Sequence, residues 1–342
     1  MDNEKIYEIL KSLSEAEGIA GNERAVTTRI ESFFSPERII KRGGSLLVSL
    51  ASPREDRENL LVDAHIDRIG FRVTYITDGG FLKIGAVGGI DTRVLPAAEV
   101  TVIGKNGAIN GVICTKPPHL SGGDSEKKSV KVEDFAVDVG MDKAAAEAAI
   151  PLGSAVYLTN TCEKMLGDRV TGAAFDNRAG AAVLLAALPD INSENCKYNV
   201  YYLFSEGEEV NERGAKTAPF GIDFARAIIV DTSFARGNGE DEHKSGRLGG
   251  GVMIGVSSTL DGDFSSEMTD LAKEREIPFQ IEVMPEKTGT NADEIGTLAG
   301  GVKTVTLSFP IRSMHTAVES LSLSDINAAA RLIAAYVKGE KA

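Results

Sequence analysis

The 342-residue sequence has no tryptophan, four histidines and three cysteines. The cysteines lie far apart, at positions 114, 162 and 196, and none belongs to a C-x-x-C pair. This spacing argues against a disulfide framework or a thiolate zinc site, and it indicates a reducing compartment, the cytoplasm. Because free cysteine is usually packed inside a protein, these thiols are expected to be buried.

Long apolar runs and an excess of positive charge are also missing. The longest apolar runs, such as residues 181–188, fall well short of the roughly 20 residues that a transmembrane helix needs. The N-terminus lacks a basic segment followed by an apolar one, so no secretory signal is expected. Lysine and arginine number 37 against 50 acidic residues, and the net charge of −13 repels nucleic acid and anionic membranes. Neither is therefore an expected partner.

The residues that are present have the composition of a globular protein, with 42% hydrophobic and 25% charged. Apolar spacing predicts helices within residues 6–13 and 26–33, followed by strands at 46–50 and 59–65. Later segments alternate between helices, at 177–188, 265–275 and 324–337, and strands, at 199–204, 227–230, 251–255 and 302–307. This alternation predicts an α/β fold with a mainly parallel sheet and helices on both faces.

Residues 70–159 have a different pattern, which predicts an inserted small β-barrel domain. Short β-rich runs are separated by turn sequences such as Asp78-Gly-Gly and Asn106-Gly. The runs span residues 71–76, 81–84, 99–103, 111–114 and 155–158. The α/β domain is therefore expected to be discontinuous, formed by residues 1–69 and 160–342.

Two of the four histidines follow apolar strands. His65 ends one predicted strand, and His315 comes after another. In an open α/β sheet, ligands bind at the carboxyl ends of the strands. Asp67 lies two residues beyond His65, close enough to hydrogen-bond the imidazole and fix its tautomer. By itself, a histidine followed by such an aspartate is weak evidence for a metal site.

Several carboxylates occupy comparable positions. Asp176 precedes an apolar helix, where it has the alternative interpretation of a helix N-cap. Glu206, Glu208 and Glu209 directly follow a strand, where a solvated turn is the alternative, and Asp231 ends the next strand. Together with the histidines they make a mixed imidazole and carboxylate set, which suits zinc, cobalt or manganese. One carboxylate shared between two such sets is typical of a two-metal hydrolase.

These segments resemble the family-42 metallopeptidases, the tetrahedral (TET) or glutamyl aminopeptidases, some of which carry an endoglucanase label. The likeness runs along nearly the whole chain. Its most specific stretches are DAHID at 63–67, AFDNRAG at 174–180, EEVNERGA at 208–215, RLGGG at 247–251 and IRSMH at 311–315, with KPPHL at 116–120 in the insertion. The resemblance implies a zinc-exopeptidase-like fold and an aminopeptidase that hydrolyses N-terminal residues from peptides.

The resemblance also implies roles for individual residues. It implies two divalent ions, zinc first, with cobalt or manganese as alternatives. His65 and Asp231 would bind one ion, Glu209 and His315 would bind the other, and Asp176 would lie between them. Glu208 would be the general base acting on a metal-activated bridging water, and Asp67 would orient His65. His119 and His243 would not be ligands. The insertion would serve dimerisation and assembly of a homo-oligomer, a dodecameric shell.

The sequence departs from the family pattern at Arg68, Gly207 and Asn291, and none of these removes an implied ligand or the base. Side-chain preference is not carried over, but Asp293 or Glu294 is expected to favour basic or neutral N-terminal residues. Two alternatives remain at this point. One is an endoglucanase-type glycoside hydrolase, which also uses two carboxylates but would usually need more than 6% aromatic residues for its cleft. The other is a non-catalytic assembly protein on the same fold.

Overall fold

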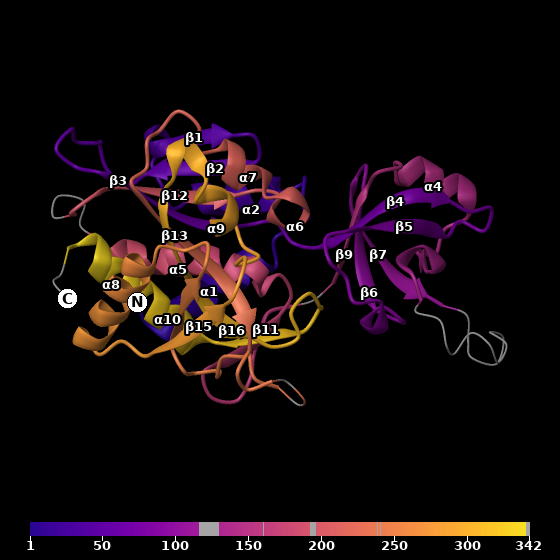
Figure 1. Ribbon diagram of the computed structural model, residues 1–342. Coiled ribbons are helices and arrows are strands. Elements are labelled where there is room, and N and C mark those ends of the chain that lie inside the picture. The colour runs from indigo at the N-terminus through magenta and orange to yellow at the C-terminus, as the bar shows by residue number, and fades with distance from the viewer. Residues whose placement is uncertain (116–129, 160, 192–195, 238, 240, 340–342) are drawn as a thin grey trace.

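The computed structural model describes the chain except residues 116–129, 160, 192–195, 238, 240 and 340–342. It contains a large α/β body and a smaller β body that projects from it (Figure 1). The expectation for His119 lies outside the described residues. In the described part of the chain, no helix is long and apolar enough to cross a membrane.

An eight-stranded sheet forms the centre of the α/β body, with the order β1-β2-β12-β3-β13-β16-β14-β15. The strands are β1 (Ile39–Arg42), β2 (Ser45–Ser49), β3 (Asn59–His65), β12 (Asn199–Ser205), β13 (Arg226–Phe234), β14 (Val252–Ser257), β15 (Phe279–Met284) and β16 (Lys303–Ile311). The central strands β12, β3, β13 and β16 are parallel, whereas β2 and β14 pair antiparallel with their neighbours β12 and β16. The predicted mainly parallel sheet is therefore confirmed.

Helices cover both faces of this sheet because its central strands are apolar on both sides. On β3, Leu60 and Val62 contact the larger helical layer and Leu61 contacts the smaller one. The larger layer consists of α1 (Asn3–Ser14), α2 (Arg24–Glu31), α5 (Phe175–Ala187), α8 (Gly262–Glu274) and α10 (Leu323–Val337). The smaller layer contains α7 (Arg213–Thr217) and α9 (Ala292–Ile295), and the short α6 (Glu208–Asn211) precedes α7.

The inserted body is a closed antiparallel barrel, as predicted. Its order is β4-β5-β8-β7-β6-β9. The strands are β4 (Gly70–Ile76), β5 (Leu82–Val87), β6 (Glu99–Gly104), β7 (Gly107–Cys114), β8 (Ala136–Asp138) and β9 (Ala155–Leu158). Its interior is a separate apolar core that includes Phe71, Leu82 and Val102. The barrel also carries one helix that the sequence analysis missed, α4 (Lys143–Ala149).

Three further differences from the predicted elements bear on function. Strand β13 runs on to Phe234, so Asp231 lies within the strand and not at its end. Strand β15 was not predicted; its side chains are only partly buried, which gives it a weak apolar signal at the sheet edge. A small sheet joins β10 (Glu163–Lys164), β11 (Arg169–Gly172) and β17 (Glu319–Ser322), and it lies between the barrel exit and the segments bearing Asp176 and His315.

Candidate metal centre

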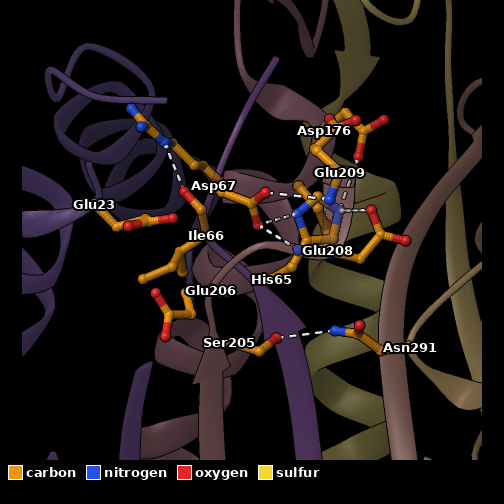
Figure 2. Close-up of polar contacts among 12 residues, drawn as sticks. Glu23, His65, Ile66, Asp67, Asp176, Ser205, Glu206, Glu208, Glu209 and Asn291 are labelled. Atoms are coloured by element: carbon orange, nitrogen blue, oxygen red, sulfur yellow. Dashed lines mark hydrogen bonds and ion pairs between the residues drawn. The ribbon is translucent and has the colours of Figure 1, made fainter. Parts of the chain in front are cut away.

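The first group of candidate ligands surrounds His65, the last residue of β3. Its imidazole is almost fully buried, and its Nε2 lies 3.2 Å from Asp176 Oδ1, 3.6 Å from Asp231 Oδ1 and 3.8 Å from Glu208 Oε2. Figure 2 shows the side chains of His65, Asp176 and Glu208 converging. Atoms of His65, Glu208 and Asp231 are close enough together to hold one metal ion. We call these three residues the His65 group.

The second group lies against the other oxygen of Asp176. His315 Nε2 is 3.2 Å from Asp176 Oδ2 and 3.5 Å from Glu209 Oε1. Asp176, Glu209 and His315 can also hold one ion between them, and we call them the His315 group. Because Asp176 turns one oxygen to each histidine, its carboxylate lies between the two groups.

The local structure explains why the Asp176 carboxylate is available. Asp176 and Asn177 have non-helical backbone angles, and Asp176 does not cap helix α5. Instead, Asn177 Oδ1 accepts a hydrogen bond of 3.0 Å from the amide of Gly180. The Asn177 side-chain amide also donates to Val230 O at 2.7 Å, which ties this turn to strand β13. The neighbouring asparagine thus takes the capping position that the alternative interpretation gave to Asp176.

The three glutamates after β12 point in different directions. The carboxylate of Asp67 is fully buried and accepts hydrogen bonds from the amides of Glu208, at 3.0 Å, and Glu209, at 3.2 Å. Gly207, with φ of +68°, makes the turn that presents these amides. Glu206 lies apart from both (Figure 2), and it pairs with Arg213 at 2.6 Å. A solvated turn is therefore not what the structure contains here.

The contact between Asp67 and His65 is weaker than expected. His65 Nδ1 lies 3.4 Å from Asp67 Oδ1, and Nδ1 is buried without a hydrogen-bond partner of good geometry. The interaction is thus an electrostatic contact, and the short hydrogen bonds of Asp67 go to the backbone of the glutamate turn. Asp67 therefore joins the segment that carries His65 to the segment that carries Glu208 and Glu209.

Burial and mutual repulsion keep protons on part of the carboxylate set. Burial raises the pKa of Glu208 to about 8 and that of Glu209 to about 9, and the neighbouring aspartates add to both shifts. Burial also raises the pKa of Asp231. For Asp176 burial acts in the same direction, but hydrogen bonds from His315 and His65 outweigh it and lower the pKa.

The histidines respond to the same negative field. Burial disfavours their charged form, yet Asp176 and Glu209 together raise the pKa of His315 to about 9. For His65, too, the surrounding carboxylates outweigh burial and raise the pKa.

This chemistry fits divalent cations. A cation can replace the protons that such a cluster would otherwise retain, because carboxylate and imidazole ligands must give up their protons to bind metal. Glu209 Oε1 is buried and has no hydrogen-bond partner, which is the condition of an oxygen that awaits a cation. Imidazole nitrogen with carboxylate oxygen is a donor set for zinc, cobalt or manganese.

The structure brings together every residue that the sequence analysis proposed for the site. His65, Asp176, Glu209, Asp231 and His315 fall within the two groups, and Asp67 lies directly behind them. One detail differs in emphasis, because Glu208 lies within ligand distance in the His65 group although it was assigned only as a base. His243 lines the adjoining cavity but belongs to neither group.

A cavity of about 960 Å³ opens over both groups, with strand β15 along one wall. Neither of the acidic residues expected to influence side-chain preference lines it. Asp293 accepts hydrogen bonds from the amides of Thr288 and Gly289, and Glu294 pairs with Lys216 at 3.5 Å. That expectation stays a prediction; the acidic residues that line the cavity away from the two groups are Glu242, Glu282 and Glu286.

Sequence reasoning also missed a layer of buried polar residues beneath the site. Asn291, noted only as a departure from the family pattern, donates to Asp63 Oδ2 at 2.8 Å and to Ser205 Oγ at 2.9 Å (Figure 2). Asp63 and Ser205 lie on β3 and β12, so Asn291 links the two strands beside His65. A buried carboxylate, Glu319, lies behind Asp176 and His315. An acid inside an otherwise apolar strand was the available signal for Asp63.

An open, mainly parallel sheet with two imidazole and carboxylate groups above its strands defines a candidate two-metal hydrolase. The family profile of the M42 glutamyl aminopeptidases matches residues 44–332. The chain belongs to this family and is an aminopeptidase of it.

Individual relatives cover almost the same length. A lysyl aminopeptidase of Pyrococcus furiosus is 26% identical over 340 residues, covering 97% of this chain and 96% of the relative. A TET aminopeptidase from a marine sediment archaeon of the Thaumarchaeota has 28% identity and a TM-score of 0.92, covering 99% of this chain and 97% of that one. The TET1 peptidase of Pyrococcus horikoshii, reported to assemble into a tetrahedron or a large octahedral shell, has 28% identity and a TM-score of 0.85, covering 97% and 99%.

Proposed function

We propose that this protein is a dinuclear-metal aminopeptidase that hydrolyses N-terminal residues from peptides. The observation that carries the proposal is the position of Asp176, with one carboxylate oxygen 3.2 Å from His65 and the other 3.2 Å from His315. His65 and Asp231 would hold one ion, Glu209 and His315 the other, and Asp176 both. Zinc is the ion we favour, with cobalt or manganese as alternatives.

When bound, two such ions would lower the pKa of a water and polarise the scissile carbonyl. Glu208 is the residue we assign to proton transfer. A general base must lie within reach of the reacting water, and the Glu208 carboxylate lines the cavity 3.8 Å from His65 Nε2. Asp67 accepts a hydrogen bond from the backbone amide of Glu208 and so fixes the turn that carries it. Glu208 would take a proton from the attacking water and pass it to the leaving amine.

Charge supports removal of residues from the N-terminus. Five carboxylates, those of Asp67, Asp176, Glu208, Glu209 and Asp231, exceed by about one the four positive charges of two divalent ions, and this negative balance favours a substrate that carries a protonated α-amine. The cavity extends beyond the ligand groups, so it has room for the first side chain. Glu242, Glu282 and Glu286 outnumber the two lysines of that part, Lys244 and Lys287, so we expect basic and neutral N-terminal residues to be preferred over glutamate.

Assembly is a further part of the proposal. The Pyrococcus horikoshii TET1 peptidase matches 97% of this chain, and that share includes most of the inserted barrel. We propose that the barrel domain, residues 70–159, serves dimerisation and assembly into a homo-oligomer, a dodecamer. Exposed Tyr75 and Leu152 on the barrel provide apolar contact area. Three free cysteines, two of them buried, support a location in the cytoplasm.

The experiment that tests the function is metal removal and return. The chain is dialysed against EDTA, supplied with Zn²⁺, Co²⁺ or Mn²⁺, and assayed on lysyl, leucyl and glutamyl p-nitroanilides. Acetylated leucyl p-nitroanilide and carboxymethylcellulose serve as controls. We expect loss with EDTA, recovery with at least one ion, and no cleavage of either control. Activity that survives complete metal removal would contradict the proposal, and cleavage of cellulose would favour a glycoside hydrolase. A metal-loaded chain inactive on every peptide would favour a non-catalytic assembly role.

A further inference from the structure

Glu319 is a buried acid that belongs to neither ligand group. It is the first residue of β17, where it pairs with Gly172 of β11, and it is only 2% exposed. An ionisable side chain this deeply buried is costly unless its oxygens are well hydrogen-bonded. The hydrogen-bond partners of Glu319 therefore indicate its role.

Both oxygens of Glu319 accept hydrogen bonds from the backbone of the candidate ligand segments. Oε2 accepts from the amide of Phe175, at 2.7 Å, and from that of Asp176, at 3.3 Å. Oε1 accepts from the amide of His315 at 2.8 Å. One carboxylate thus joins two ligand-bearing residues that are more than a hundred positions apart in the sequence.

These two ligands need such an anchor more than the others do. Asp176 has non-helical angles at the start of α5, and His315 lies in a bend with φ of +62°, so neither is held by a strand ladder. His65, in contrast, ends β3, where Ser205 of β12 is its register partner. A carboxyl group that accepts three backbone amides fixes the segments that donate them, because each hydrogen bond weakens if a segment shifts. Glu319 therefore supplies fixation that regular secondary structure does not provide.

We propose that Glu319 is a positioning residue that fixes Asp176 and His315 relative to each other, and so sets the affinity of the His315 group for its cation. It does not contact the cation or the substrate. The inference rests on the proposed pair of metal ions. The effect of Glu319 is larger on the His315 group, because there it fixes both Asp176 and His315, whereas in the His65 site it fixes only the shared Asp176.

The test is a Co²⁺ titration of the metal-free, full-length Glu319→Gln variant. Visible absorbance and equilibrium dialysis report binding step by step. Glutamine keeps the shape of glutamate but turns an NH₂ group toward one of the amide donors. We expect the weaker of the two binding steps to lose about 10- to 100-fold in affinity, the usual effect of removing a hydrogen-bond partner behind a ligand. The stronger step should change much less.

The matched control is Asp325→Asn. Asp325 is also fully buried and accepts two backbone amides, from Gly249 at 2.8 Å and Gly251 at 2.7 Å, but it does not line the cavity. This variant should lose comparable thermal stability yet bind both ions like the wild type. Equal weakening of both steps in Glu319→Gln, or the same weakening in Asp325→Asn, would overturn the proposal.

Two further results separate failure of this inference from misfolding of the variant and from absence of the metal pair. If Glu319→Gln does not fold, Glu319→Asp is used instead, because it retains the carboxyl group with a shorter reach. Selective weakening of one binding step in this variant supports the proposal, and two unchanged steps overturn it. A wild-type chain that binds fewer than two Co²⁺ ions would remove the proposed metal pair itself. A wild type with two ions and a Glu319→Gln variant with two unchanged ions would remove only the role of Glu319.

Discussion

The two ligand groups are built on different kinds of scaffold. In the His65 group, His65 ends β3 and Asp231 lies inside β13, both central strands of the sheet, and both side chains are less than 10% exposed. In the His315 group, His315 lies in a bend after β16, Asp176 lies in an irregular turn before the regular part of α5, and the His315 side chain is 30% exposed. His65 and Asp231 are thus held by strands of the sheet, whereas Asp176 and His315 are held in turns and loops.

This difference indicates which group loses more conformational entropy when its ligands are ordered around an ion. Strand ladders have already fixed the backbone of His65 and Asp231, so little further conformational entropy is lost when they bind an ion. The loops of the His315 group must be held by additional contacts, of which Glu319 provides three. We therefore expect the His65 group to bind its cation more tightly and to release it more slowly.

The largest expected effect is on turnover, and it tests whether Glu208 is a general base or a ligand of the His65 group. If Glu208 is the base, Glu208→Gln lowers kcat by about 10²- to 10⁴-fold, because a neutral amide cannot accept the proton, while both ions stay bound. Turnover of leucyl p-nitroanilide and metal content by mass spectrometry are measured on the same sample.

The outcome separates two assignments for one side chain. Glu286→Gln is the matched control, because Glu286 is an exposed glutamate that lines the same cavity. It should keep near-wild-type kcat and both ions. Loss of one ion from Glu208→Gln would instead make Glu208 a ligand of the His65 group, as its 3.8 Å distance from His65 Nε2 allows. Normal turnover with both ions bound would remove it from the mechanism.

The next effect tests the comparison directly, by removing one histidine from each group. His315→Ala should abolish the weaker Co²⁺ step and leave the stronger one within a few-fold. His65→Ala should weaken binding overall by more than the roughly 10- to 100-fold that changes behind a ligand produce. Dialysis against graded chelator concentrations measures both variants, and His243→Ala, which alters an exposed cavity residue, serves as control. If His315→Ala removed the stronger step, the assigned order of affinities would be wrong.

The same division explains what could be predicted from the sequence. Strand β3 and the helix of α5 were predictable because apolar residues at period two or at helical spacing mark them directly. His65 and Asp231 then followed from the rule that ligands gather at the carboxyl ends of parallel strands, even though β13 continues beyond Asp231. His315 was singled out by the same rule and Asp176 by its place before an apolar helix, but the division of the ligands between two ions came from the family resemblance.

What remained hidden depends on contacts between distant segments. Glu319 reads as an ordinary surface acid, and only the pairing of β17 with β11 places it against Asp176 and His315. Asn291 was noted only as a departure from the family pattern, but it donates a hydrogen bond to Asp63 inside the α/β body. Strand β15, whose acid Glu282 lines the cavity, was missed because its side chains alternate weakly at the sheet edge. Such residues gain their roles from tertiary structure alone.

The smallest effect we expect is a pH dependence of stability in the metal-free protein. Burial and neighbouring charges raise the pKa of Glu208 to about 8, and of Glu209 and His315 to about 9, above the ordinary values of Glu and His. Between about pH 5 and 9 the folded chain therefore holds more protons than the unfolded chain. Stability then falls as pH rises through this window, because the slope follows the difference in bound protons.

Metal ions should reverse this trend. Glu209 and His315 retain protons up to about pH 9, so protons compete with the cation of the His315 group, which we expect to be the more weakly bound of the two. Lowering the pH from 9 to 7 should thus release the weaker Co²⁺ ion first. Thermal unfolding across this range, with and without Co²⁺, measures the effect at roughly 1–2 °C for each kcal/mol in a chain of 342 residues. A metal-free Tm that rises with pH would contradict the raised pKa values, because that slope requires groups whose pKa is lowered on folding.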